Sequence, residues 1–220
     1  MKNKLPELLE LEQIIHDGAP HLGVQTACEV NAGPHRLPVY ALTLGNPSPD
    51  VPAVGFFGGI HGLERIGTQV LLVFLRGLLA RLRWDRMLHQ QLESVRLIFM
   101  PLINPGGMWN STRCNPNGVD LMRNAPVEAR DPVPFLLGGQ RISRHLPWFR
   151  GNFATPMELE SAAVCRIVRE ELLPREFRLL EYMMRHPGIV LSRAMIMEHV
   201  WTADSDPFSN TVEAHIRNIR

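Results

Sequence analysis

The chain has 220 residues, of which 45% are hydrophobic and 20% charged, and these proportions exclude a disordered or low-complexity protein. Its formal net charge of +1 provides no overall attraction to nucleic acid or to acidic membranes, so any contact with DNA must come from a local arrangement of residues. The three cysteines form no C-x-x-C pair, which predicts reduced thiols in a cytoplasmic protein. The start of the sequence lacks the apolar core of a signal peptide, and the longest apolar stretch is interrupted by Arg76, so no membrane contact is expected.

The first hundred residues carry the pattern of a mixed α/β sheet. Hydrophobic residues at helical spacing predict an amphipathic helix over 5–16, and a strand-like run follows over 37–44. The apolar run 54–60 shows no alternation, which predicts a strand buried on both faces of a sheet. A helix over 65–83 and a strand over 95–100 come next, and strand, helix and strand in this order form a βαβ unit.

Beyond this unit, regular structure is sparse until residue 158. Residues 101–107 are expected to leave the last strand by a turn, and residues 104–156 are rich in Gly, Pro and Asn and predict loops. A helix is predicted over 158–172.

His61 and Glu64 stand where the apolar strand ends and the next helix begins. A spacing of three residues places both side chains on one face of a helical turn. An imidazole nitrogen and a carboxylate oxygen can then bind one Zn²⁺, which takes three protein ligands and a water in catalytic sites. The alternative is a surface histidine beside a glutamate that interacts with a helix N-terminus.

Several ordered motifs, over roughly residues 40–172, resemble the zinc carboxypeptidase family. They comprise residues 58–64 (GGIHGLE), 104–107 (NPGG), Arg113, 118–124 (GVDLMRN), 146–151 (LPWFRG) and 157–160 (MELE). The resemblance implies a carboxypeptidase-like mixed sheet with helices, and a peptide or small amide as substrate. It further implies that His61 and Glu64 bind zinc, that Arg113 polarises the scissile carbonyl, and that Arg123 binds a substrate carboxylate.

The sequence also departs from the family pattern. Met122 stands where the family usually has Asn, and a thioether cannot donate a hydrogen bond to a carboxylate. In the family a third zinc ligand, a histidine, follows the helix predicted here over 158–172, and a catalytic glutamate comes later, whereas here the pattern changes. The spacing of the remaining histidines predicts that they are not ligands; these include His89, His145, His186 and His199. The resemblance therefore predicts an incomplete site, with weak or absent zinc binding and no peptidase activity.

The last fifty residues carry a different pattern. Pro174 suits the first position of a helix that ends before Pro187, and Ser192 is a good N-cap for a second helix. Asn210 or Thr211 is expected to cap a third helix. Three short helices in this order, over about residues 172–220, resemble the OmpR/PhoB-type winged-helix domain of response regulators.

This second resemblance implies that the third helix enters the major groove of DNA. His215, Arg217 and Arg220 would then face DNA, and Thr211 would contact a phosphate. The loop over 202–209 would be the surface offered to RNA polymerase. The alternative is that these arginines form a solvated helix face. The sheet before the first helix and the wing after the third are not found, so an all-α remnant of a winged helix is predicted.

Three interpretations remain: a zinc-dependent hydrolase, a transcriptional regulator with a non-catalytic N-terminal domain, and a fusion or truncation product of the two. We favour the fusion, with a truncated carboxypeptidase-like domain over 1–172 and a truncated DNA-binding segment over 173–220. A sheet that lacks its later strands leaves an apolar edge open, so self-association is also expected.

Overall fold

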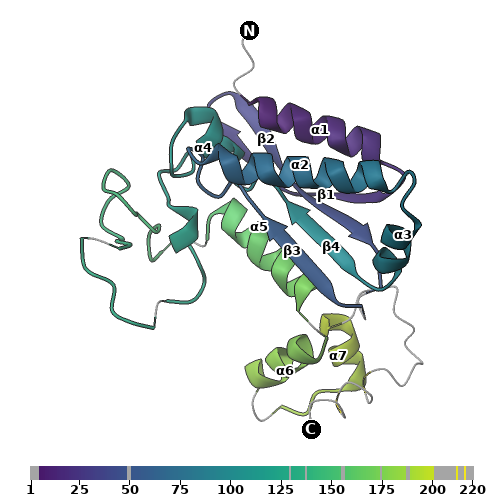
Figure 1. Cartoon of the computed structure of the whole chain (residues 1–220). Helices are drawn as coiled ribbons and strands as arrows, with labels where there is room; N and C mark the ends of the chain where they lie inside the picture. Colours follow the sequence, from purple (N-terminus) through teal and green to yellow (C-terminus); the bar gives the residue numbers. More distant parts are fainter. Residues whose placement is uncertain are drawn as a thin grey trace.

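The computed structural model describes residues 5–48, 51–128, 130–136, 138–154, 157–173, 175–186 and 189–200, together with Val212 and Ile216 (Figure 1). In chain order its elements are α1 (Pro6–Gly18), β1 (Leu22–Ala32), β2 (His35–Gly45), β3 (Ala53–Phe57), α2 (Arg65–Arg81), α3 (Arg86–Glu93), β4 (Arg96–Met100), α4 (Pro105–Asn110), η1 (Leu121–Arg123), α5 (Leu159–Ile167), η2 (Val168–Leu172), α6 (Arg175–Arg185) and α7 (Arg193–Val200). The predicted mixed α/β architecture is confirmed.

The four strands form one sheet in the order β1-β2-β4-β3. β1 and β2 are an antiparallel hairpin that turns at Gly33, whose φ of 59° lies in the left-handed region that favours glycine. β2 also pairs antiparallel with β4 over Leu42–Gly45, and β4 pairs parallel with β3 along its whole length. The parallel pair is the predicted βαβ unit, with α2 and α3 in the connection.

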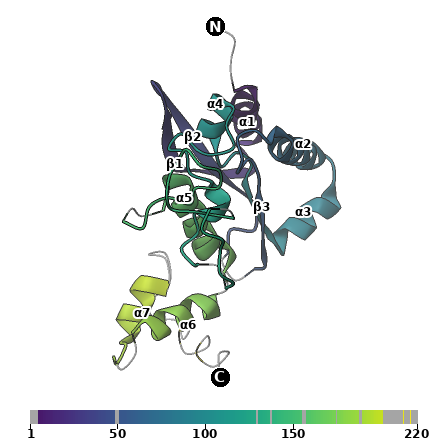
Figure 2. The same cartoon turned by 90° about the vertical axis from the view of Figure 1, so that its left-hand side faces the viewer.

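Helices cover both faces of this sheet, and α1 and α2 lie on the face opposite α5 (Figure 2). Leu72 and Leu75 of α2 are fully buried against Phe99 of β4, in a core that α1 completes with Leu8 and Leu11. On the other face a smaller core surrounds α5; it contains Val39, Ala41, Ile98, Met100, Ile103, Leu121 and Ile167. The sheet is thus the middle of three layers, as in other α/β folds.

The two C-terminal helices have a small core of their own. Leu179 of α6 is buried against Ile196 and Val200 of α7, and Val212 joins this cluster. The predicted N-cap of the second helix is confirmed, because the Ser192 hydroxyl accepts a hydrogen bond from the Met195 amide at 3.2 Å. Among the described residues, no helix is long and apolar enough to cross a membrane.

Two expectations from the sequence were wrong, and one strand was missed. β3 was expected to be buried on both faces, but Val54 is 44% exposed and the other residues of the strand are only partly buried. The expected turn at 101–107 instead leads into α4, since the Asn104 side chain accepts a hydrogen bond from the Gly107 amide and Pro105 occupies the first helical turn. β1 was not predicted, because its exposed positions alternate poorly with apolar ones.

The loops that leave β3 and β4 are packed directly against each other. The Ile103 amide donates to the Gly58 carbonyl at 3.1 Å, and the Asn104 amide donates to the Gly59 carbonyl at 2.8 Å. A Cβ atom at Gly62 would lie 2.1 Å from the Gly107 carbonyl carbon, which is backbone and cannot swing away. Glycine at position 62 therefore sets how closely the two loops approach.

We predict that Gly62→Ala destabilises the protein by about 1–3 kcal/mol, because the added methyl group forces the two loops apart. Gly77→Ala is the matched control, since nothing lies within 4 Å of a Cβ at that helical position. This control should stabilise the protein by about 0.5–1 kcal/mol through helix propensity. Urea unfolding of the variants measures both effects, and equal stabilities would contradict the packing argument.

Candidate functional site

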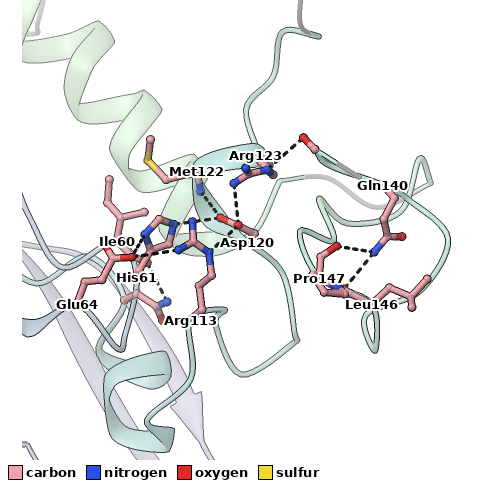
Figure 3. Close-up of polar contacts among 12 residues, drawn as sticks. Ile60, His61, Glu64, Arg113, Asp120, Met122, Arg123, Gln140, Leu146 and Pro147 are labelled. Carbon is pink, nitrogen blue, oxygen red and sulfur yellow. Dashed lines mark hydrogen bonds and ion pairs between the residues drawn. The ribbon is translucent and has the colours of Figure 1, made fainter. Parts of the chain in front are cut away.

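The candidate site lies where β3 and β4 end, which is where the carboxyl ends of parallel strands bring their following loops together (Figure 3). His61 and Glu64 come from the loop between β3 and α2, and Arg113 follows α4. Asp120 is the N-cap of η1, and Arg123 is its last residue. The structure thus brings together all four residues that the sequence singled out in the front part of the chain: His61, Glu64, Arg113 and Arg123.

His61 and Glu64 point toward each other. The His61 Nδ1 atom lies 3.1 Å from the Glu64 Oε1 atom, and the Glu64 side chain is largely exposed whereas His61 is mostly buried. Two ligand atoms bound to the same tetrahedral zinc at about 2.0–2.2 Å lie roughly 3.3 Å apart. The separation in the structure therefore fits two adjacent zinc ligands.

Asp120 holds these groups in place, and the sequence analysis assigned it no role. Its carboxylate is fully buried and lies 3.3 Å from the His61 Nε2 atom, opposite the nitrogen that faces Glu64. The Met122 amide donates to the Asp120 Oδ1 atom at 3.2 Å. A carboxylate behind the imidazole fixes the ring orientation and makes the other nitrogen a better metal ligand.

Two arginines bind the second oxygen of Asp120. Arg113 reaches it with Nε at 3.2 Å and reaches Glu64 Oε1 with Nη1 at 3.1 Å, so its guanidinium bridges two carboxylates. Arg123 reaches Asp120 with Nη1 at 2.9 Å. Each guanidinium compensates for the burial of the Asp120 charge, and each is still partly exposed and able to attract an anionic or carbonyl oxygen.

A loop that is folded around Gln140 lies beside Arg123. The Gln140 Nε2 atom donates to the carbonyl oxygen of Ser143 at 2.8 Å. It also donates to the carbonyl oxygen of Leu146 at 3.2 Å (Figure 3). Arg123 also donates from Nε to the Gly138 carbonyl at 3.2 Å, and its guanidinium lies 5.8 Å from the centre of the Trp148 ring. These contacts use part of the Arg123 fork, so fewer of its donors remain for a substrate carboxylate than the sequence predicted.

Asn104 is a second positioning residue that sequence reasoning missed. Its buried side chain donates to the Ile60 carbonyl at 3.0 Å and accepts from the Gly107 amide at 2.7 Å. It therefore connects the backbone before His61 with the first turn of α4. The Asn-Pro pair before a short apolar run was a signal for such an N-cap.

Among the described residues, no group of three His, Cys, Asp or Glu side chains could hold a metal ion. His89 Nε2 lies 2.7 Å from the Leu82 carbonyl, and His186 Nδ1 lies 2.8 Å from the Tyr182 carbonyl. The His199 ring stacks on Tyr182. These histidines have structural partners elsewhere in the fold.

The candidate DNA-binding residues lie outside the part of the chain that the structure describes. This applies to Thr211, His215, Arg217 and Arg220. Of the predicted third helix, only Val212 and Ile216 are described, and both are helical. The DNA-contacting roles therefore stay predictions.

A second cluster of polar side chains, with two carboxylates and one amide, supports the segment that carries Asp120. Asn115 Nδ2 donates to Glu158 at 2.8 Å and lies 3.4 Å from both Glu160 oxygens. Glu160 is almost fully buried, and this burial raises the pKa of its carboxyl above the ordinary value of 4.5. Burial also raises the pKa of the nearby Cys28 thiol to about 11, with a further contribution from the Glu160 charge.

We predict that Glu160 makes the protein less stable as the pH rises. The folded state binds this proton more tightly than the unfolded chain, so stability is greatest below the ordinary pKa and falls as the pH rises through the raised pKa. Glu160→Gln should reduce this decline and stabilise the protein at neutral pH in urea unfolding measured from pH 4 upward. The exposed Glu93→Gln is the control, and identical pH profiles for all three proteins would contradict the prediction.

We also predict that Asp120→Asn lowers the free energy of unfolding by about 1–3 kcal/mol, because its charge-assisted hydrogen bonds to two arginines are lost. The exposed Asp17→Asn should change it by less than about 0.5 kcal/mol. Thermal or urea unfolding measures both variants. Equal effects would show that the Asp120 network contributes nothing to stability.

The two parts of the chain are similar to two different kinds of protein. Residues 169–220 match the family model for the C-terminal part of transcriptional regulatory proteins. The transcriptional regulatory protein YkoG of Bacillus subtilis is 43% identical over 75 residues, which cover 32% of this chain and 33% of YkoG. Carboxypeptidase SOL1 of Arabidopsis thaliana is 35% identical over 75 residues, which cover 34% of this chain and 15% of that protein.

Solved structures show the same fold for the front part. Thrombin-activatable fibrinolysis inhibitor superposes with a TM-score of 0.52 at 17% identity, over 74% of this chain and 42% of its own. The bovine inhibitor, in complex with tick carboxypeptidase inhibitor, gives a TM-score of 0.52 at 17% identity and covers 77% of this chain and 56% of its own. The chain therefore spans only part of the length of the relatives it matches.

The zinc carboxypeptidase family model matches residues 35–179, well over half of the chain. The matched segment contains strands β2, β3 and β4, the GGIHGLE loop and the Asp120 network described above. The chain therefore belongs to the zinc carboxypeptidase family, and its residues 169–220 are similar to the C-terminal part of transcriptional regulatory proteins.

Proposed function

We propose that this chain is a fusion product, with a zinc-binding but non-hydrolytic carboxypeptidase-like part over 1–172 and a DNA-binding part over 173–220. The observation that supports the front half is the convergence of His61 and Glu64 at 3.1 Å, with Asp120 behind the imidazole. Family models for the two parts support the fusion.

In the front part, His61 Nδ1 and Glu64 would hold a zinc ion, which as a Lewis acid polarises a carbonyl and activates a water molecule. Asp120 keeps the imidazole oriented through Nε2. Arg113 would stabilise negative charge on a substrate oxygen, and Arg123 would bind a carboxylate of a peptide or small amide. Met122 is 57% exposed beside Arg123, and its side chain adds apolar surface there but no donor.

The same geometry explains why we propose binding without hydrolysis. Zinc hydrolases use three protein ligands and a general base, and the described residues supply two ligands. Glu64 is one of these ligands, and Asp120 is buried and bound by two arginines. Neither carboxylate is free to accept a proton from water.

In the back part, Thr211, His215, Arg217 and Arg220 would contact DNA, and residues 202–209 would face RNA polymerase. The alternative function is a transcriptional regulator whose N-terminal part is not catalytic, and its relatives named as transcriptional regulators favour it. For both functions we propose a cytoplasmic location, where cysteines such as Cys28, Cys114 and Cys165 stay reduced.

The zinc proposal predicts saturable binding of one Zn²⁺ per chain in competition with a chromogenic chelator. His61→Ala should abolish it, and Asp120→Asn should weaken it by about 10–100-fold, because the imidazole loses its orienting carboxylate. His16→Ala, at an exposed position on α1, is the control. Equal zinc binding by the wild type and His61→Ala would overturn the site. Zinc-dependent peptide hydrolysis that His61→Ala removes would keep the site but overturn the non-hydrolytic assignment.

The DNA proposal predicts a mobility shift that weakens steeply with salt. Arg217→Ala and Arg220→Ala should each reduce the slope of log affinity against log salt by about 1. Arg36→Ala, at an exposed position on β2, is the control. Unchanged slopes for both C-terminal variants would show that this helix does not bind DNA phosphates.

A further inference from the structure

Helix α2 is apolar on the side that faces solvent as well as on the side that faces the sheet. Its exposed large hydrophobic residues are Ile66 at 69%, Val70 at 57%, Val73 at 64% and Phe74 at 41% exposure. Gly67, Gly77 and Ala80 share this side at helical spacing and are also exposed. Over these positions, from Ile66 to Ala80, the outward side carries no charged residue.

Two charged residues of α2, Arg65 and Arg76, lie on a different side, toward α1, and the third, Arg81 at the end of the helix, pairs with Asp85. Arg65 Nη1 binds Glu7 Oε2 at 2.6 Å, and Arg76 pairs with Glu10. The helix thus has a buried side, a side that pairs with α1 and an apolar side without a described partner. A helix that is apolar on nearly all sides is typical of a protein interior, and a large exposed apolar patch marks an interaction surface.

The open edge of β3 continues this apolar surface. Phe56 of β3 and Phe74 of α2 contact each other with ring centres 5.3 Å apart, and Val54 is exposed at the edge. No described strand pairs with the outer edge of β3. On the opposite face of the sheet the same strand is covered, since a Cβ at Gly55 would lie 2.6 Å from Leu172 of η2. Among the described residues, this open surface therefore comprises the outer edge of β3 and the apolar outward side of α2, and it does not extend to the opposite face of the sheet.

We propose that a second copy of this chain covers this surface, through antiparallel pairing of β3 with β3 of the partner around a two-fold axis. An occupant must supply both a free strand edge and an apolar helix on the same side of the sheet. A second copy supplies both by symmetry, because a two-fold axis normal to the sheet places α2 of the partner beside α2. The exposed glycines allow the two helices to approach closely.

The charge distribution favours self-pairing. The strand Ala53–Phe57 has no ionisable side chain, and the outward residues of α2 have none between Ile66 and Ala80. Two identical surfaces therefore meet without like-charge repulsion. The formal net charge of +1 adds little repulsion between whole copies. The interface goes beyond the zinc and DNA proposals and depends on neither.

Analytical ultracentrifugation of the full chain over a concentration series tests the proposal. A reversible monomer–dimer equilibrium is expected. Val70→Glu should weaken dimerisation by about 100-fold or more, because it places like charges in the interface. Val54→Lys should also weaken it, because a lysine on an edge strand opposes edge pairing. The control Gln90→Glu adds the same charge at an exposed position on α3 and should leave the dimer intact.

A mixture of Val70→Glu and Val70→Lys should form heterodimers, since opposite charges then meet across the two-fold axis. Cooperative thermal unfolding of each variant confirms that it is folded. A wild-type chain that stays monomeric at every concentration would overturn the proposal, as would open-ended aggregation. Dimers that persist in both Val70→Glu and Val54→Lys would place the interface elsewhere on the molecule.

Discussion

The parallel pairing of β3 with β4 is the constraint on which both the site and the open surface depend. Parallel neighbours require a crossover, and here α2 and α3 supply it between Phe57 and Arg96. The same pairing places the ends of both strands at one edge, where the Gly58–Gly59 backbone accepts hydrogen bonds from Ile103 and Asn104. One structural unit thus positions His61 and also exposes the outer side of α2.

Within the site, the buried carboxylate of Asp120 organises the other charged groups. It faces His61 with one oxygen and two arginines with the other, so it orients the imidazole while the guanidinium groups compensate for its own burial. Glu64, in contrast, is largely exposed, and its partners among the described residues are His61 and Arg113. The buried carboxylate of Asp120 therefore supports the site, and the exposed carboxylate of Glu64 is the candidate zinc ligand.

Hydrophobic periodicity is a local signal, and it predicted the βαβ unit. The resemblance to the zinc carboxypeptidase family predicted that His61, Glu64, Arg113 and Arg123 share one site. The sequence could not predict the role of Asp120, which depends on contacts with His61 across 59 positions of the chain. It also predicted that β3 is buried on both faces of the sheet. The uniform apolar character of Val54–Phe57 indicates a strand that needs cover on all sides, and the described chain covers only some of them.

The exposed apolar surface of α2 and the incomplete ligand set of the candidate site can have the same origin. Residues such as Val70 and Val73 are too apolar for a solvated helix, and in the proposed zinc site the described residues supply two of the three ligands that zinc hydrolases use. Both features are expected where a carboxypeptidase-like sheet gives way, after η2, to a segment of different ancestry. Pairing through β3 and α2 would cover the apolar surface without completing the site. It would also join two copies of the C-terminal segment, and helix-turn-helix proteins commonly bind DNA as dimers with two half-sites.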